Sequence, residues 1–362
     1  MDGVSTETPT FDLGFVLPFA IQKIERYNLK LSTTHETIQT ILAMIYKFEP
    51  LYMERVWGGN AFARHLARRI PPSNRIGESW ELVDREDHQS VLLNTSLKGS
   101  SLRSLIEKEG NSIMGPKWRP ERHFPILVKW LDCNERLSLQ VHPPTKVAKM
   151  IGGEPKTENW YIAHANPDAG LFLGLKGGTT KEIFAEAIEK GTAEAHCNRI
   201  SSEAGSSVLV ESGRLHAIDA GNLILEIQQN SDTTFRVYDW GRSGLNGLPR
   251  ELHIEESMRC IDFNDVEPNL LPPEGSSVCI LADCPLFRIR KFTAKKGETL
   301  LLKESNQECM LLNPVGCDLH IGEDFLPSGT CGMSPYSAKC NVSFSKDGVL
   351  LVTDKFYRYK QL

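Results

Sequence analysis

A seven-residue segment combines alternating apolar positions with two residue types that bind metal ions. Residues 137–143 read Leu-Ser-Leu-Gln-Val-His-Pro. Successive side chains of a β-strand point to opposite faces, so Ser138, Gln140 and His142 are expected on one face and the apolar residues on the other. An amide oxygen and an imidazole nitrogen would then point to the same side. The segment therefore predicts two ligands of a metal site.

A second segment resembles a sequence motif of the cupin barrels. Residues 205–216 begin with a glycine, continue through a short run to Gly213, and end at His216. Cupins usually carry proline where Glu211 stands here, and histidine in their first motif where this chain has Gln140. His216 is therefore a candidate ligand of the same ion.

The carboxylate of the set is expected from a strand between these two segments. Lys156-Thr157-Glu158-Asn159-Trp160 can return a carboxylate to the site on a neighbouring strand. Any one of these side chains alone is more often a core or surface residue than a ligand. Because two independent motifs supply complementary ligands, we predict a site for Zn²⁺ or another divalent ion. Its expected ligands are Gln140, His142, Glu158 and His216.

The elements that must position these residues are mainly β-strands. Short apolar runs separated by turn residues predict strands, and helical periodicity appears over 101–108 and 180–190 only. No alternation of helices and strands indicates a parallel sheet, so the strands are expected to be antiparallel. The predicted strands before the Pro/Gly-rich stretch 268–275 are 91–93, 124–130, 137–141, 160–163, 207–210, 223–228 and 234–238.

Six further runs follow that stretch and predict a second β-sandwich (287–292, 300–302, 309–313, 318–321, 341–345 and 349–353). The expected fold is two cupin-like jelly-roll sandwiches or barrels with a few short helices in the first. We expect residues 45–265 to form the metal-binding domain, with a helical insert near 179–200. Residues 276–362 form a second domain without metal. Residues 1–43 read as an extension outside the core, with a possible short helix over 35–44.

Composition narrows the classes of function. The chain has 362 residues, 41 basic against 46 acidic side chains and a net charge of −5, which argues against nucleic acid as its partner. No apolar run is long enough to cross a membrane. Nine cysteines without a Cys-x-x-Cys pair are typical of cytosolic thiols, so a cytoplasmic protein is expected. The sequence does not decide between a monomer and a homodimer, which are the two states that we expect.

Over residues 45–362, the sequence is similar to the short, bacterial-type class I mannose-6-phosphate isomerases (phosphomannose isomerases). The resemblance rests on an ordered set of blocks, which is far more specific than any one of them. These are Phe48-Glu49-Pro50 with Arg55-Val56-Trp57-Gly58-Gly59, Gly77-Glu78-Ser79-Trp80-Glu81, Phe124-Pro125-Ile126-Leu127-Val128-Lys129, the segment 137–143, Lys156-Thr157-Glu158-Asn159-Trp160-Tyr161, His216-Ala217-Ile218 and the segment 226–242.

The resemblance implies a zinc-dependent isomerase that interconverts mannose 6-phosphate and fructose 6-phosphate through a cis-enediol, with one Zn²⁺ per chain. The family's metal ligands fall on Gln140, His142, Glu158 and His216. Its catalytic basic residues fall on Lys156 and Arg236, and its substrate-binding residues on Lys129 and Ser138. A nearby metal ion should lower the pKa of Lys156. The proton-transfer base is then either Lys156 or a water on the metal.

Two features depart from the family pattern, and two other functions stay open. Pro144 and Thr145 follow the first ligand segment where the family often has aspartates, and Glu211 replaces the usual proline. A cupin dioxygenase would hold iron with two histidines and one carboxylate. A non-catalytic cupin that binds sugar phosphates would keep the pocket but not the charges of Lys156 and Arg236. Arg236 itself could have a structural role instead of a functional one, in an ion pair with Asp232 or Asp239.

Overall fold

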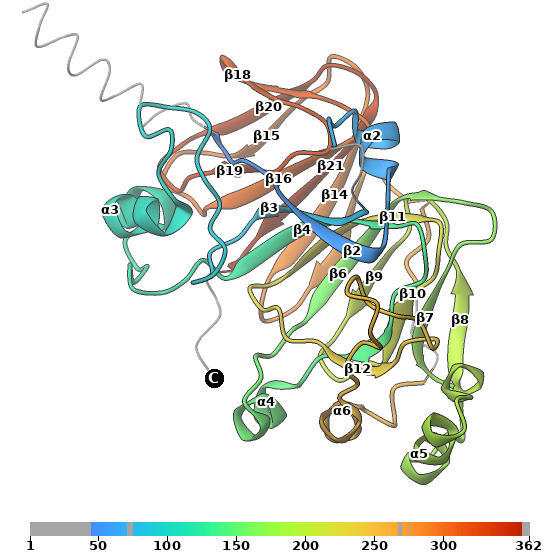
Figure 1. Ribbon diagram of the computed structural model, residues 1–362. Helices are drawn as coiled ribbons and strands as arrows, with labels where there is room; N and C mark the ends of the chain where they lie inside the picture. The colour runs from blue at the N-terminus through green and yellow to red at the C-terminus, as the bar shows by residue number, and fades with distance from the viewer. Residues whose placement is uncertain (1–44, 71–74, 267–269, 274, 357–362) are drawn as a thin grey trace, which may run out of the picture.

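The computed structural model describes residues 45–70, 75–266, 270–273 and 275–356 (Figure 1). The extension 1–43 and the helix expected over 35–44 lie outside these residues. The described chain is built mainly of antiparallel strands with a few short helices, which confirms the predicted fold class. Within the described residues, no helix is long and apolar enough to cross a lipid bilayer.

The first half of the chain forms two sheets that face each other. A six-stranded sheet has the order β2 (Leu51–Gly59), β3 (Ile76–Leu82), β4 (Ile126–Cys133), β11 (Asn222–Gln229), β6 (Glu158–Ala165) and β9 (Ser207–Val210). A five-stranded sheet has the order β12 (Phe235–Tyr238), β5 (Leu139–Val141), β10 (His216–Ile218), β7 (Gly170–Leu175) and β8 (Cys197–Ser201). Buried side chains from both sheets, among them Trp160, Ile224 and Leu173, pack in one core between them.

The C-terminal strands form a second pair of sheets. The larger has the order β1 (Tyr46–Lys47), β19 (Gly332–Ser334), β16 (Met310–Val315), β21 (Gly348–Asp354), β14 (Arg288–Ala294) and β13 (Val278–Asp283). The smaller has the order β15 (Thr299–Lys303), β20 (Cys340–Phe344), β17 (Leu319–Ile321) and β18 (Asp324–Leu326). The strand β1 comes from the start of the described chain, yet Tyr46 pairs with Met333 in this C-terminal sheet.

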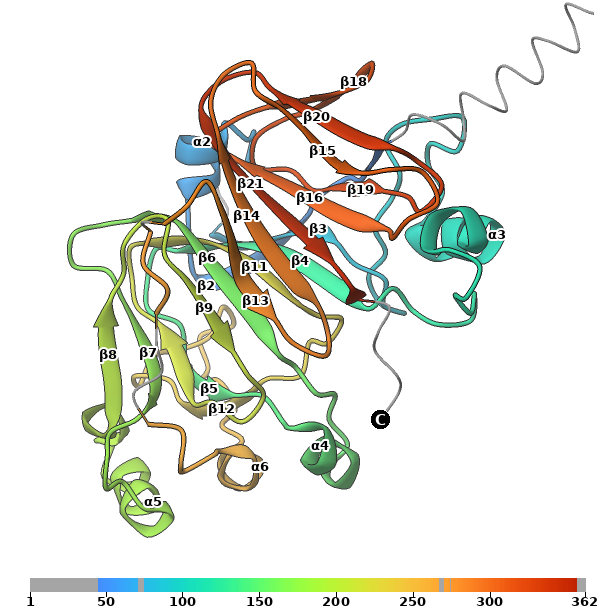
Figure 2. The same cartoon turned by 180° about the vertical axis from the view of Figure 1, so that it is seen from behind.

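The helices lie at the edges of the sheets. Three of them, α4 (Thr145–Ile151), α5 (Lys181–Glu189) and α6 (Ile254–Cys260), lie at the end of the first pair of sheets that points away from the C-terminal sheets in both views (Figures 1 and 2). Helix α3 (Leu102–Met114) begins where the Ser101 side chain accepts a hydrogen bond from the Ser104 backbone N–H. The remaining short helices are α2 (Ala61–Leu66) and the 3₁₀ turn η1 (Ala193–His196).

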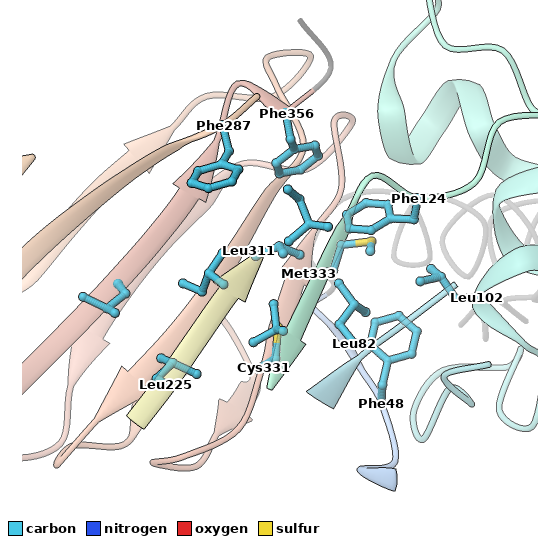
Figure 3. Close-up of a cluster of buried hydrophobic side chains, with 14 of the residues drawn as sticks. Phe48, Leu82, Leu102, Phe124, Leu225, Phe287, Leu311, Cys331, Met333 and Phe356 are labelled. Atoms are coloured by element: carbon cyan, nitrogen blue, oxygen red, sulfur yellow. The ribbon is translucent and has the colours of Figure 1, made fainter. Parts of the chain in front are cut away.

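The two pairs of sheets share a hydrophobic core. Figure 3 shows Leu82, Phe124 and Leu225 of the first pair packed with Leu311 and Met333 of the second, in one cluster of buried residues. Separation of the two halves would expose these side chains to water, so the hydrophobic effect holds the halves together.

A buried ion pair lies at the same boundary. Arg68 binds Glu81 with Nη1 2.7 Å from Oε1, and its guanidinium also donates to the carbonyl oxygen of Gly329. The side chains of Arg68 and Glu81 are 9% and 3% exposed. Trp130 donates from Nε1 to the same carbonyl at 2.8 Å. Hydrogen bonds to the Gly329 carbonyl therefore connect the two halves in addition to the shared hydrophobic core.

Most strands predicted from apolar runs are present, with ends that differ by a few residues. Residues 207–210 form β9 as predicted, whereas 91–93 make only isolated bridges. Strands β2 and β3 were not predicted because they lack a clean alternation. All of β3 is buried, and its Glu78 and Glu81 are tolerated there because Arg55 and Arg68 pair with them.

Candidate active site

The four predicted ligands come together from both sheets of the first half. Gln140 on β5 is the direct antiparallel partner of His216 on β10, so the two side chains lie next to each other. His142 follows β5, and Glu158 opens β6 in the opposite sheet. Ligand atoms of His142, Glu158 and His216 all lie within 4.8 Å of one another. The turn before His216 forms with Glu211 in place of proline, since Arg214 N–H donates to its carbonyl at 3.0 Å.

Backbone carbonyls orient both imidazoles. Nδ1 of His142 lies 2.9 Å from the carbonyl oxygen of Thr233, and Nδ1 of His216 lies 2.8 Å from that of Arg214. A carbonyl can only accept, so each Nδ1 carries the proton and each Nε2 presents its lone pair. Those Nε2 atoms lie 3.3 Å and 3.5 Å from the two carboxylate oxygens of Glu158.

The ligand atoms are buried without the partners that buried polar atoms need. His142 Nε2 and Oε1 of Glu158 make no hydrogen bond to any part of the chain that the structure describes, and Oε2 of Glu158 lies 2.9 Å from the Lys156 ammonium nitrogen. His142, Glu158 and His216 are 1%, 0% and 1% exposed. Such orphaned acceptors are costly unless something positive binds them. A divalent cation between them satisfies all of these atoms at once.

Gln140 lies at the edge of this set. Its Nε2 is 3.2 Å from Nε2 of His216, and its Oε1 accepts a hydrogen bond from Ser138 at 3.3 Å. Rotation of the amide by half a turn exchanges the two atoms and aims the oxygen, which is the metal-binding atom, at the site. The residues therefore fit an N/O ligand set of the kind that zinc accepts.

The electrostatics keep the ligands in their metal-binding protonation states. Burial lowers the pKa of His142, and it lowers the pKa of His216 to about 3, with a further contribution from His142. Burial would raise the pKa of Glu158, but the positive charge of Lys156 holds it well below its ordinary value. Neutral imidazoles and an ionised carboxylate are the forms that bind metal ions.

A cavity of about 390 Å³ opens beside the ligands. It brings together all four remaining predicted site residues, Ser138, Lys129, Lys156 and Arg236, together with Gln140. It is also lined by residues that the sequence analysis did not single out for a role, which are Arg55, Trp57, Glu78, Leu131, Leu137, Glu226, Asp232, Thr234 and Arg250.

Lys156 lies between two carboxylates. Its Nζ is 2.9 Å from Oε2 of Glu158 and 3.7 Å from Oε1 of Glu226. Burial by itself would lower the pKa of Lys156, but these two carboxylates raise it above its ordinary value. The chain's own groups therefore act against the lowering that a metal ion was expected to cause, and they favour a protonated Lys156.

Glu226 is the chemically most informative residue that sequence reasoning did not select. Burial, with the charge of Glu158, raises the pKa of Glu226 to about 7, and Trp160 Nε1 donates to its Oε2 at 3.0 Å. A carboxyl group with that pKa exchanges protons readily near neutral pH. The sequence carries one signal that could have selected Glu226, since it is a lone carboxylate in the middle of the run Asn222–Gln229, which is buried. Charged side chains are rarely buried without a role.

Lys129 is positioned by a network on the neighbouring strands. Its Nζ lies 3.4 Å from Asp232, 3.9 Å from Glu78 and 4.6 Å from the centre of the Trp80 ring. Burial opposes ionisation of Glu78, but Lys129 and Arg55 lower its pKa to about 2. The ammonium group therefore has a fixed place at the cavity wall.

Arg236 keeps much of its guanidinium free for a ligand. Its Nη1 donates to the Glu251 carbonyl at 2.7 Å, while its buried Nε makes no hydrogen bond within the described residues. The ion pair considered with Asp232 or Asp239 does not form among the described residues. Asp239 instead binds Arg250 and Arg242. Burial and the charge of Arg250 lower the pKa of Arg236, so an anion in the cavity would relieve this repulsion.

Comparison with known proteins connects this arrangement to one family. The family model of the type I phosphomannose isomerase catalytic domain matches residues 45–154. The probable mannose-6-phosphate isomerase GmuF of Bacillus subtilis is 41% identical over 250 residues, covering 67% of this chain and 78% of that protein. The mannose-6-phosphate isomerase ManA of the same organism is 38% identical over 274 residues, covering 70% and 80%.

Solved structures show the same likeness. The mannose 6-phosphate isomerase from Bacillus subtilis superposes with a TM-score of 0.74 at 26% identity, covering 85% of this chain and 99% of that one. A zinc-bound mannose 6-phosphate isomerase superposes with a TM-score of 0.66 at 17% identity, covering 86% and 99%, and at that identity shows the fold alone.

Proposed function

This chain belongs to the type I phosphomannose isomerase family, and we propose that it is a zinc-dependent isomerase that interconverts mannose 6-phosphate and fructose 6-phosphate. The observation that carries the proposal is the convergence of buried ligand atoms from His142, Glu158 and His216, which lie within 4.8 Å of one another, beside a cavity lined by cationic side chains. We place the enzyme in the cytoplasm as a monomer or homodimer, with residues 45–265 as its catalytic domain and 276–362 as a metal-free packing domain.

One zinc ion per chain would be held by Gln140, His142, Glu158 and His216. When bound, it would act as a Lewis acid that stabilises negative charge on the oxygens at C1 and C2 of the sugar. The neutral imidazoles, the ionised carboxylate and the buried orphaned acceptors support this assignment. A zinc-bound structure is known for a protein with the same fold.

Isomerisation moves a proton between C2 and C1 through a cis-enediol. Glu226 is our candidate for the group that takes and returns this proton, because its pKa of about 7 makes it a base at neutral pH. Lys156, which is held protonated by its two carboxylate neighbours, would donate a hydrogen bond to the sugar oxygen that gains charge. This division of roles replaces Lys156 as the expected base and keeps it in the catalytic set.

The cationic wall of the cavity accounts for the phosphate. Arg236 can bind phosphate oxygens in a bidentate manner or polarise a sugar oxygen, and its unpartnered Nε supports either role. Lys129 and the hydroxyl of Ser138 line the same cavity and are our candidates for further substrate contacts.

A coupled assay of the purified protein on mannose 6-phosphate tests the proposal. We expect fructose 6-phosphate to form, a chelator to abolish the activity, and added zinc to restore it. Unaltered turnover in metal-free protein would contradict the zinc site. Oxygen uptake dependent on iron and a keto acid would identify a dioxygenase instead, and tight sugar-phosphate binding without turnover would identify a binding protein.

A further inference from the structure

A second cavity, of about 440 Å³, lies outside the proposed catalytic site. It is formed by the segment Trp118–Ile126, the loop at Glu154 and Pro155, the segment Gln229–Ser231, and Leu286 and Phe356. The two cavities have no lining residue in common. Ser231 lines the second cavity and its neighbour Asp232 lines the first, so one stretch of backbone forms a wall of both.

The second cavity has an apolar floor. The half-buried Trp118 and Leu286 give this floor its accessible apolar surface, while Phe124, Ile126 and Phe356 also line the cavity but are almost completely buried. A volume of this size suits a small metabolite, and an apolar floor suits a carbon skeleton.

Polar groups without partners surround this floor. Trp118 Nε1 and Asn230 Oδ1 are buried and make no hydrogen bond within the described residues. Among the residues that the structure describes, no carboxylate lies within ion-pair distance of Arg119 or Arg122, which also line the cavity. Two guanidinium groups are therefore available to a ligand, and one buried donor and one buried acceptor beside them lack partners.

Acidic residues weaken the positive charge only in part. Glu121 and Glu154 also line the second cavity, but Glu154 is already bound by Arg85, with Nη1 2.8 Å from Oε2. His123 is held by Asp84, with Nδ1 3.1 Å from the Asp84 carbonyl oxygen. The free charges are then two arginines against Glu121, a balance that favours an anion.

We propose that this second cavity binds a small phosphorylated metabolite and that its occupancy changes turnover in the catalytic cavity. Guanidinium groups bind phosphate oxygens through paired, charge-assisted hydrogen bonds, and the indole N–H supplies a further donor. The apolar floor would receive the carbon skeleton, which inorganic phosphate lacks. The binding part of the proposal is independent of the proposed isomerase activity, whereas the change in turnover rests on it.

Hydrogen bonds connect the shared wall to the catalytic residues. Gln229 holds Thr157 twice, since its Oε1 accepts from Thr157 N–H at 2.9 Å and its N–H donates to the Thr157 carbonyl at 3.0 Å. Thr157 lies between Lys156 and Glu158 in the sequence, so a shift of Gln229 moves both.

The same wall reaches a metal ligand on its other side. The carbonyl of Thr233 accepts from His142 Nδ1, the Thr233 hydroxyl accepts from Glu154 N–H at 3.0 Å, and Ser231 donates to the Glu154 carbonyl at 3.3 Å. A ligand that contacts Asn230 or Ser231 therefore touches a segment that orients His142. Any effect on turnover must be matched by an equal effect of substrate on effector binding.

Calorimetric titration of the zinc-loaded full chain tests the binding. The probes are glucose 6-phosphate and inorganic phosphate, each titrated into the wild type, Arg119→Ala/Arg122→Ala, Arg236→Ala, and Lys98→Ala/Lys346→Ala as a control for the loss of two surface charges. We expect glucose 6-phosphate to bind the wild type, the Arg236 variant and the control with similar Kd values. In the Arg119/Arg122 variant the Kd should rise about tenfold or more. Loss of this isotherm in the Arg236 variant, or no binding at all in the wild type, would overturn the proposal. Equal binding of inorganic phosphate would overturn the role of the apolar floor.

Steady-state kinetics test the coupling. An effector in a separate cavity should change kcat or KM by a factor that reaches a plateau, about fivefold or more, whereas a competitor raises KM without limit. We expect the plateau in the wild type and its loss in Arg119→Ala/Arg122→Ala, whose activity without effector should be unchanged. Trp118→Phe, which removes the indole N–H and part of the aromatic surface, should weaken the effect. Binding in the second cavity with no kinetic change would overturn the regulatory part of the proposal.

Discussion

The carbonyl oxygen of Thr233 lies 2.9 Å from Nδ1 of His142 and so directs the lone pair of that imidazole at Glu158. The carbonyl of Arg214 does the same for His216. Two backbone atoms on separate segments thus hold both rings in the tautomer that binds a cation through Nε2. The site is organised by the backbone before any ion arrives.

Removal of either imidazole should empty the metal site. We expect His142→Ala and His216→Ala to lose bound zinc, from one ion per chain, and to lower kcat by at least about 100-fold, because the remaining ligands cannot fill a tetrahedral site. Elemental analysis and the coupled assay measure the two effects. His164→Ala, which changes a histidine outside the site, should behave as the wild type. Full zinc content in both ligand variants would contradict the assignment.

Loss of the Arg236 guanidinium should affect the reaction and leave the metal in place. We expect Arg236→Ala to lower kcat/KM by about 10²-fold or more, as for loss of one transition-state donor, with zinc content unchanged. Arg236→Lys keeps the charge without the bidentate geometry and should recover only part of the loss. Arg259→Ala, at an exposed position of α6, is the matched control. An Arg236 variant that also lost zinc would point to a structural role instead.

The raised pKa of Glu226 predicts a pH dependence. A carboxyl group with a pKa of about 7 is protonated, and inactive as a base, below that pH, so kcat/KM of the wild type should rise as the pH increases toward 7. A bound cation would favour the ionised form and place this rise at or below pH 7. Glu226→Gln should lower kcat by about 10²–10⁴-fold and remove the rise. Persistence of the same rising limb in Glu226→Gln would show that another group is the base.

The buried pair of Arg68 and Glu81 should matter for stability. Arg68→Ala leaves the Glu81 carboxylate buried without its counter-charge, which typically costs about 3–5 kcal/mol of unfolding free energy. Urea denaturation followed by circular dichroism measures the change. Lys190→Ala removes an exposed partner of Glu186 and should cost about 0.5 kcal/mol or less. If both variants unfold at the same urea concentration, the buried pair does not stabilise the boundary between the two halves.

Alternation along strands was enough to anticipate which residues of 137–143 lie at the candidate site. Successive side chains of a strand point to opposite faces, so Ser138, Gln140 and His142 in and around β5 share one face. The apolar Leu139 and Val141 point the other way and pack in a buried hydrophobic cluster. The glycine at 213 takes a positive φ of 98°, as the turn before the second imidazole requires. Local rules therefore selected residues that the fold brings together.

The rest of the cavity depends on contacts that local rules do not encode. Arg250 comes from a loop and is held in place by Asp239, with Nε 2.7 Å from Oδ2. Glu226 lies in a strand whose neighbours are apolar or amide residues, and its role follows only from the distance to Lys156 across the sheet. Alternation cannot report which charges meet once strands from distant parts of the sequence have paired.

The pairing of Tyr46 with Met333 also sets an order of events during synthesis. The strand β1 is made before every other described strand, whereas its partner β19 is made after all strands of the first pair of sheets. That edge of the C-terminal sheet can therefore pair only once β19 has been made, which makes it one of the most non-local contacts of the fold.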